Sequence, residues 1–306
     1  MCKVPQGREG REGCQDKGLS AVESIYPVCV TPYYYSLGER ELGVRLQYEP
    51  SARELSDTGD PDPLGEGSFF PLQGLLRKYS DRLLVFASRE CFVHCRHCNR
   101  KRYWRDGLPL ANVDEVIAYV KAHPEIREII LSGGDPLALS LRKLKLWFSS
   151  LRAISSSLVI RVGTRAPVVA PNVITRELCE LFRIYFPLYV LTQFNHPAEL
   201  TKEATGAINL IRKAGIPVLN QAVLLAGVND DIDLLEELFA KLICVGIKPY
   251  YLFQCEPVRG AMHFVVSIER AKGLIAKLRG RLSGLAMPMF CIDGKGQKLV
   301  MGDFCL

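Results

Sequence analysis

The residues best suited to chemistry in this sequence are three cysteines that lie close together. Cys91, Cys95 and Cys98 are spaced C-x3-C-x2-C within the basic segment RECFVHCRHCNRKRYWR at residues 89–105. An apolar run at residues 83–86 comes directly before this segment. Three thiolates this close in sequence can bind one metal centre. No fourth cysteine lies nearby, so the predicted centre has three protein ligands.

The missing fourth ligand distinguishes two kinds of metal site. A [4Fe-4S] cube held by three cysteines leaves one iron open to a small molecule, whereas a structural zinc site needs four protein ligands. Zinc would need His94 or His97, which lie inside the cysteine segment rather than at the spacing of a usual second ligand pair. The spacing therefore favours a reactive iron–sulfur cluster. Zinc, or three cysteines that only pack in a core, are the alternatives.

Composition limits the class of protein. The 306 residues, 48% hydrophobic and 24% charged, are typical of one large globular α/β domain. The eleven cysteines, without a secretory signal, favour free thiols in a reducing compartment over a disulfide framework. No apolar run reaches the roughly eighteen residues that span a bilayer. We therefore expect a cytoplasmic protein without membrane contact, and no nucleic-acid partner, because the net charge of +6 is spread along most of the chain.

Changes in composition divide the chain into four segments. Residues 1–20 are polar, charged and glycine-rich, which predicts a disordered leader. Residues 21–80 are interrupted by prolines and contain the loop GDPDPLGEGS, which predicts a segment that wraps around the main domain. Residues 81–280 are expected to form that main domain. Residues 281–306 are expected to form a short C-terminal extension.

From residue 82 onward, short apolar runs alternate with amphipathic stretches, which indicates repeated βα units around a parallel sheet. Six such units are two short of a closed eightfold barrel, so we predict an open (β/α)6 three-quarter barrel. Thr175 and Asp231 are expected to cap helices. The expected strands are 83–87, 128–131, 158–162, 188–192, 218–225 and 248–253, and the expected helices are 113–122, 141–154, 175–185, 199–214, 231–245 and 267–279.

Polar residues follow these apolar runs. The second run leads to Ser-Gly-Gly-Asp-Pro at residues 132–136, where two glycines let the backbone approach a ligand closely, although a tight turn alone would also explain them. Because the carboxyl ends of parallel strands meet at one rim, we expect such clusters to line one site. The other clusters are at residues 161–165, 193–197, 220–221 and 254–256.

The cysteine spacing after a first strand resembles the signature of radical S-adenosylmethionine (SAM) enzymes, in which the open iron binds SAM. Within that superfamily, several segments resemble the lysine 2,3-aminomutases, in the same order and at similar intervals. The resemblance covers roughly residues 30–294. The matching segments are TPYYYSLGE, RKYSDRLL, CRHCNRKR, LSGGDPL, RVGTRAPVV, FNHPAELT, NQAVLLAGVND and PYYLFQCE.

The resemblance implies roles for individual residues. Arg100 would bind the substrate carboxylate, because a guanidinium can donate two parallel hydrogen bonds to it. Tyr79 and Arg82 would lie near the phosphate of pyridoxal 5′-phosphate (PLP). The cluster ligands would be the three cysteines, and the residues around SAM would be Gly133, Gly134, Asp135, His196 and Gln221.

The C-terminal part of the resemblance concerns PLP and the substrate side chain. Lys298 would bind PLP, with Lys295 as the second candidate, in a loop that is shorter and poorer in glycine than the family's. Glu256 and Asp293 would bind the distal ammonium of lysine, and two buried carboxylates favour a basic partner. An ordinary surface position remains the alternative for each of these charged residues.

The implied reaction moves the amino group of lysine, or of a similar basic amino acid, from the α to the β carbon while PLP holds it as an imine. The cofactors would be a [4Fe-4S] cluster, SAM and PLP. The expected partners are the amino acid and an electron donor such as flavodoxin or ferredoxin, and a homo-oligomer is left open. The alternatives are a short-chain relative that modifies a lysine for a translation factor, a relative without PLP, and an iron–sulfur electron carrier or regulator.

Overall fold

The computed structural model describes residues 15–56, 58–296 and 298–300, and its main feature is one nine-stranded sheet with the strands in sequence order. Strands β2 to β8 pair in parallel, and antiparallel strands β1 and β9 form the two edges. The strands are β1 (Leu75–Tyr79), β2 (Arg82–Ser88), β3 (Glu128–Gly133), β4 (Val159–Gly163), β5 (Leu188–Thr192), β6 (Val218–Leu224), β7 (Lys248–Gln254), β8 (Met289–Asp293) and β9 (Lys298–Val300).

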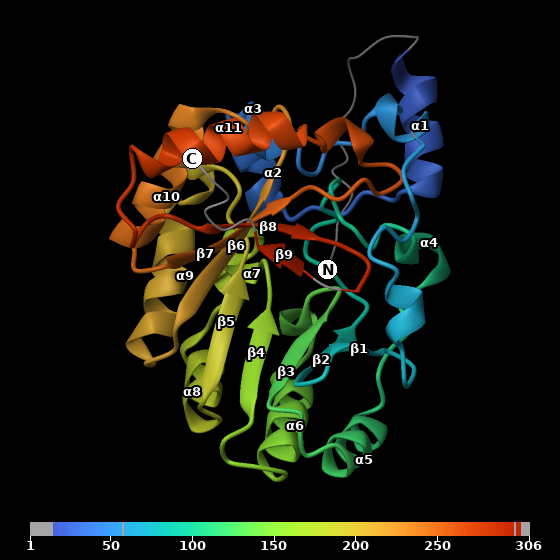
Figure 1. Cartoon of the computed structure of the whole chain (residues 1–306), viewed down its shortest axis with the longest axis vertical. Coiled ribbons are helices and arrows are strands. Elements are labelled where there is room, and N and C mark those ends of the chain that lie inside the picture. The colour runs from blue at the N-terminus through green and yellow to red at the C-terminus, as the bar shows by residue number, and fades with distance from the viewer. Residues whose placement is uncertain (1–14, 57, 297, 301–306) are drawn as a thin grey trace.

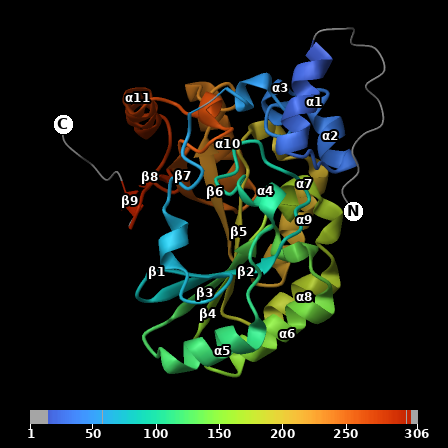
Figure 2. The ribbon, with the colours of Figure 1, turned by 90° about the vertical axis from the view of Figure 1, so that its right-hand side faces the viewer.

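A helix follows each of the first six parallel strands, and these helices lie along the outer side of the curved sheet (Figures 1 and 2). The predicted open (β/α)6 barrel is therefore confirmed. Thr175 and Asp231 both accept hydrogen bonds from free backbone N–H groups at the helix starts, as predicted. The six helices are α5 (Val113–Ala122), α6 (Leu141–Arg152), α8 (Arg176–Ile184), α9 (Lys202–Lys213), α10 (Ile232–Cys244) and α11 (Ile268–Arg279).

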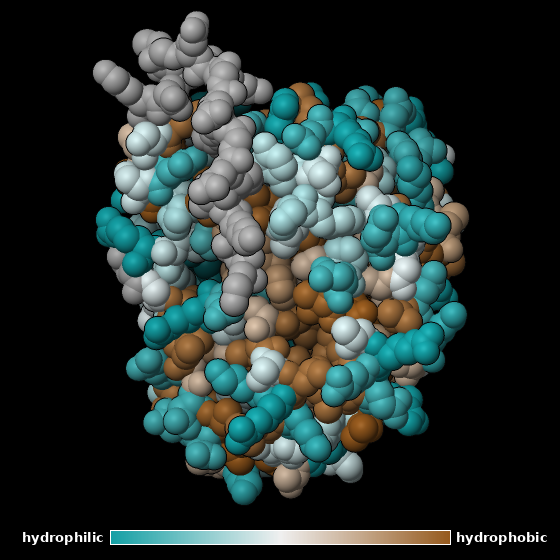
Figure 3. Space-filling model, turned by 180° about the vertical axis from the view of Figure 1, so that it is seen from behind, coloured by the Kyte–Doolittle hydropathy of each residue, from teal (hydrophilic) through white to brown (hydrophobic). Residues whose placement is uncertain are grey.

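The core lies between these helices and the sheet. Along β6, buried and partly exposed residues alternate, because successive side chains point to opposite faces of a strand. Each helix buries residues three and four positions apart, as in Leu235, Leu238, Phe239 and Leu242 of α10. Burying one such side chain contributes about 1.5–3 kcal/mol. Hydrophobic residues also gather in a hollow on the face shown in Figure 3.

The sequence pattern missed several elements. The edge strands β1 and β9 and the parallel strand β8 were not predicted, since β1 lies in the proline-interrupted segment and β9 has only three residues. The predicted leader is wrong for residues 15–20, because helix α1 (Gln15–Ile25) begins there, and Val22 of that helix is buried. Residues 1–14 and 301–306 lie outside the described part of the chain.

The N-terminal segment packs at the end of the barrel toward which the parallel strands point (Figure 1). It contributes helices α2 (Pro32–Gly38) and α3 (Leu42–Arg45), and the 3-10 helices η1 (Ala52–Glu54) and η2 (Glu66–Phe69). The backbone N–H of Arg96 donates to the carbonyl of Gln47 at 2.8 Å, and that of His94 donates to the carbonyl of Cys29 at 2.8 Å. The segment is therefore bound directly to the cysteine loop.

Two further properties concern the helices and cysteines. Among the described residues, no helix is long and apolar enough to cross a membrane. Seven of the eight cysteines in the described ranges are free thiols. The three cysteines of the candidate metal centre are among the free thiols, so they are available as ligands.

Candidate active site

A cavity of about 560 Å³ lies among the carboxyl ends of the parallel strands. Its lining comes from the cysteine loop, from the loops after β3, β4, β5 and β7, and from the C-terminal strands. The cavity brings together every predicted site residue except His196 and the second lysine candidate, Lys295. These lining residues are Tyr79, Arg82, Cys91, Cys95, Cys98, Arg100, Gly133, Gly134, Asp135, Gln221, Glu256, Asp293 and Lys298.

Gly133, the last residue of β3, and Gly134 hold the start of the cysteine loop. The backbone N–H of Gly134 donates to the carbonyl of Ser88 at 2.7 Å, and that of Asp135 donates to the carbonyl of Glu90 at 2.6 Å. A Cβ atom on Gly134 would lie 2.3 Å from the carbonyl oxygen of Glu90, and one on Gly133 would lie 2.5 Å from that of Ser88. The close backbone approach expected of these glycines is therefore made with the protein's own chain, directly before Cys91.

The three thiols of the cysteine loop are close to one another. Burial and the nearby charge of Cys95 raise the pKa of the Cys98 thiol to about 11, and burial with the charges of Cys98, Asp135 and Cys95 raises the pKa of Cys91. The backbone N–H of Arg100 donates to Cys98 Sγ at 3.4 Å. Three adjacent free thiols in a cavity, with donors already directed at the sulfurs, fit the ligand set of a [4Fe-4S] cluster with one open iron.

The histidines of the zinc alternative are engaged elsewhere. His94 Nδ1 lies 2.8 Å from the carbonyl of Pro27, and its ring stacks on Trp104, while His97 Nε2 lies 3.0 Å from Gln193 Nε2. Within the described ranges, no three His, Cys, Asp or Glu side chains are grouped to hold a single metal ion. A four-iron cube is larger than one ion, so its three cysteines need not converge on a single point.

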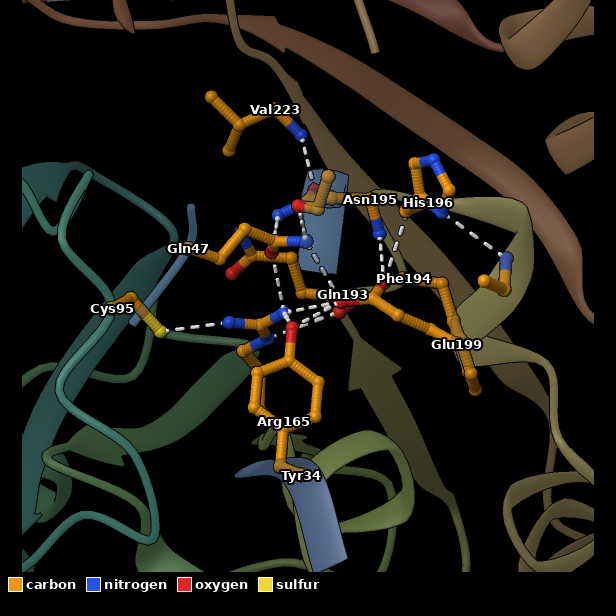
Figure 4. A network of polar contacts seen from close by, with 12 residues as sticks. Tyr34, Gln47, Cys95, Arg165, Gln193, Phe194, Asn195, His196, Glu199 and Val223 are labelled. Carbon is orange, nitrogen blue, oxygen red and sulfur yellow. Dashed lines mark hydrogen bonds and ion pairs between the residues drawn. The ribbon is translucent and has the colours of Figure 1, made fainter. Parts of the chain in front are cut away.

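Arg165, directly after β4, is a site residue to which the sequence analysis gave no role. Its Nη1 donates to Cys95 Sγ at 2.9 Å (Figure 4). The signal in the sequence was the polar cluster at residues 161–165, but nothing local indicated its partner. Asp135 supports this arginine from the β3 side, because its carboxylate accepts from the backbone N–H of Arg165 at 2.9 Å and from the hydroxyl of Thr164 at 2.8 Å. Burial raises the pKa of Asp135 to about 6, and the bond from Thr164 partly opposes this rise.

Arg100 lies in the cavity, but its guanidinium already has a carboxylate partner. Glu66 of η2 accepts from Arg100 Nη2 at 2.6 Å and from Nε at 3.1 Å, and it also accepts from Arg102 at 2.8 Å. Glu66 is 3% exposed and its pKa is lowered, because the two arginines outweigh the burial of the carboxylate. Glu66 is a second residue that the sequence did not reveal, since it lies in a loop that reads as solvated.

Glu256 and Asp293 form an acidic pair on the cavity wall. Burial raises the pKa of Glu256 to about 7, and the charge of Asp293 adds to this rise while Arg100 opposes it. Asp293 is also paired with Lys78, whose Nζ lies 2.7 Å from Asp293 Oδ1. Lys78 is a third residue that the sequence analysis missed. The three side chains carry a net charge of −1 when Glu256 is ionised.

Lys298 and Lys295 occupy different environments. The Lys298 ammonium lies 4.3 Å from the ring centre of Tyr251 and 4.5 Å from that of Phe253, and its burial lowers the pKa. The backbone N–H of Lys298 donates to the hydroxyl of Tyr79 at 2.9 Å. The Lys295 side chain is 69% exposed and pairs with Asp60 at 3.5 Å. Only Lys298 of these two lines the cavity.

Of the two remaining predicted site residues, Arg82 lines the cavity and His196 does not. Arg82 lines the cavity with its guanidinium 4.6 Å from the ring centre of Tyr79, and it also pairs with Asp81 at 2.9 Å. His196 does not line the cavity. Its ring accepts from the backbone N–H of Ala198 at 3.3 Å and packs against Gly43, so it begins the 3-10 helix η5 (Pro197–Glu199). A contact between His196 and SAM stays a prediction.

Comparison with known proteins agrees with this fold and site. The family model of the Radical SAM superfamily matches residues 85–238. A radical SAM methyltransferase from Sphaerobacter thermophilus has a similar fold, with a TM-score of 0.52 and 21% identity over 73% of this chain and 72% of its own. The open barrel, with its three cysteines after the first parallel strand, is therefore a radical SAM domain. Proteins of this superfamily bind a [4Fe-4S] cluster and SAM.

Curated relatives identify the family within the radical SAM superfamily. A protein from Aquifex aeolicus is 41% identical over 95% of this chain and 82% of its own length. The L-lysine 2,3-aminomutase of Fusobacterium nucleatum is 39% identical, over 92% of this chain and 68% of its own. The glutamate 2,3-aminomutase of Clostridioides difficile is 37% identical, over 90% of this chain and 67% of its own. The chain belongs to the lysine 2,3-aminomutase family, whose members are isomerases that also use PLP.

Proposed function

We propose that this aminomutase acts on lysine or a closely similar basic amino acid, and that Glu256 and Asp293 recognise the side-chain ammonium. The observation that carries this proposal is the acidic pair in the cavity that also contains Arg100 and Lys298. Lys78 neutralises one of the two carboxylates, so a single substrate cation would balance the remaining charge. A substrate with a side-chain carboxylate, such as glutamate, would instead be repelled by Glu256 and Asp293.

At the other end of the substrate, Arg100 would bind the α-carboxylate. Glu66 occupies the Nε and Nη2 groups of this arginine, so the substrate would bind at Nη1 or displace Glu66. Substrate binding between Arg100 and the acidic pair would place its α-carboxylate at the guanidinium and its side-chain ammonium at Glu256 and Asp293. Charged residues at both ends would thus select the length of the side chain as well as its charge.

The cofactor roles of individual residues are part of the same proposal. Cys91, Cys95 and Cys98 would hold the cluster, and Gly133, Gly134, Asp135 and Gln221 would lie around SAM at the loop ends of the strands. Lys298 would bind PLP through its amine, and burial favours this role because it lowers the pKa and makes the neutral, nucleophilic amine more available. When bound, the cluster and SAM supply a carbon-centred radical for hydrogen removal, and PLP stabilises the migrating amino group.

For PLP, Lys298 would lie between aromatic rings and anion-binding groups. Tyr251 and Phe253 provide apolar surface next to its amine, and this surface would exclude water from the reacting atoms. Tyr79 lies on the edge strand β1 and Arg82 on the neighbouring strand β2, where a hydroxyl and a guanidinium could bind the phosphate. We also propose that a flavodoxin or ferredoxin reduces the cluster by one electron and that the protein works in the cytoplasm.

A reconstituted sample tests the proposal. The protein, loaded anaerobically with iron, sulfide and PLP, should show a cluster absorbance and a PLP band that borohydride bleaches. With SAM as the radical source and dithionite as the one-electron reductant, it should convert lysine but not glutamate to the β-amino acid. Lys298→Ala should abolish the PLP band, whereas Lys295→Ala is the matched control and should retain it. A cluster without any bleachable band would instead support a relative without PLP. Retention of the band in Lys298→Ala would refute the assignment of this lysine.

A further inference from the structure

Arg165 is held in one position by a buried network around Glu199 (Figure 4). Its Nη2 donates to Glu199 Oε1 at 2.9 Å and to Gln47 Oε1 at 2.8 Å, while its Nε donates to the carbonyl of Gln193 at 3.2 Å. The guanidinium is thus engaged on all three nitrogens, because Nη1 contacts Cys95 Sγ. The arginine has little freedom to turn away from the sulfur.

Glu199 is itself fixed by donors from three elements. Its Oε1 also accepts from the hydroxyl of Tyr34 on α2 at 2.5 Å, and its Oε2 accepts from the backbone N–H groups of Asn195 at 2.6 Å and His196 at 3.0 Å. Glu199 is 0% exposed and Arg165 is 7% exposed. Burying both charges of the pair between Arg165 and Glu199 costs desolvation energy, which their attraction does not clearly repay. A contribution to stability therefore does not by itself explain this buried ion pair.

We propose that Arg165 is a positioning residue that tunes the reduction of the cluster through its hydrogen bond to Cys95. Hydrogen bonds to a ligating sulfur are one of the factors that set the potential of an iron–sulfur cluster, because they stabilise its more negative, reduced state. A charge-assisted donor is stronger than a neutral one. This inference rests on the proposed function, since it requires that Cys95 ligates a cluster.

Glu199 should affect the potential of the cluster in the opposite direction to Arg165. Its carboxylate lies on the Nη2 side of the guanidinium, away from the nitrogen that contacts Cys95, and it partly neutralises the positive charge. Removal of the arginine charge should therefore make the cluster harder to reduce, whereas removal of the glutamate charge should make it easier to reduce. A network with only a structural role would not shift the potential in opposite directions.

The test is the midpoint potential of the loaded full-length protein, measured by titration with dithionite and followed by electron paramagnetic resonance. In each titration the oxidised cluster takes up one electron from dithionite. We expect Arg165→Gln to shift the midpoint to a more negative value, Arg165→Lys to shift it less, and Glu199→Gln to shift it to a more positive value. Arg183→Gln is the matched control, because Arg183 is an exposed arginine paired with Glu180, and it should leave the midpoint unchanged.

Iron content and circular dichroism of each variant complete the test. A fully loaded Arg165→Gln or Arg165→Lys protein with an unchanged midpoint would refute the tuning role. Folded Arg165 variants that bind no cluster would show that the arginine only supports the loop, which also refutes tuning. A wild-type protein that binds no cluster would refute the proposed function and this inference together, so the two failures are distinguishable.

Discussion

Replacement of Glu256 by glutamine should make the protein more stable and less able to bind its substrate. Burial raises the pKa of this carboxyl from its ordinary value of 4.5 to about 7, which means that the folded protein holds the ionised form at a cost. The unfolded chain loses this proton near pH 4.5, so the cost appears as the pH rises above that value and is complete above pH 7. A shift of this size corresponds to about 3 kcal/mol at pH 8 and to less than about 1 kcal/mol at pH 5.

Glu256→Gln should therefore raise the urea midpoint at pH 8 and change it little at pH 5, as followed by circular dichroism. The same substitution removes a charged hydrogen-bond partner of about 1.5–3 kcal/mol, so the KM for lysine should rise by about 10- to 150-fold. Glu256→Asp keeps the charge and is the control, with a smaller rise in KM. In the wild-type protein, KM should increase as the pH falls below about 7, because the protonated carboxyl no longer attracts the ammonium. An equal stability change at both pH values would contradict the reasoning, and so would an unchanged KM.

Two further predictions concern the cysteine loop. Glu54→Ala should lower the free energy of unfolding by about 3–5 kcal/mol, because it leaves the buried cations Arg96 and Lys101 without their shared carboxylate. Urea titrations measure this change, and an unchanged urea midpoint would contradict the prediction. Gly134→Ala should destabilise the protein by about 1–3 kcal/mol and reduce its iron content, since the new Cβ would meet the Glu90 carbonyl. Gly206→Ala, where a Cβ meets nothing within 4 Å, is the control and should load iron normally.

The barrel could be predicted because each of its elements has a local signal. Apolar alternation and short polar caps such as Thr175 are visible within one element, and the structure confirms them. The edge strand β9 has three residues, too few for a periodic pattern, and it forms by pairing with β8, where Lys298 lies opposite Asp293. The position of β9 could therefore not be predicted from the local sequence, because it depends on tertiary contacts.

The candidate site was predictable in its residue types but not in its pairings. The spacing of Cys91, Cys95 and Cys98 is local, so it was visible in the sequence. The pair between Lys78 and Asp293 joins residues 215 positions apart, and that between Glu66 and Arg100 joins residues 34 positions apart. Each of these charges reads as a solvated side chain when taken alone. Only the fold shows that each has a partner of opposite charge in the cavity.

These pairings also explain why the basic segment of the cysteine loop does not present a free basic surface. Arg96 and Lys101 share the carboxylate of Glu54, and Arg100 and Arg102 share that of Glu66. Arg102 also pairs with Asp62 at 3.1 Å, so four cations with three carboxylates leave one net positive charge beside three sulfurs that must be negative to bind iron. That excess would stabilise the thiolates and an anionic cluster. The N-terminal segment, which supplies all three carboxylates, thereby sets the charge of the loop as well as its position.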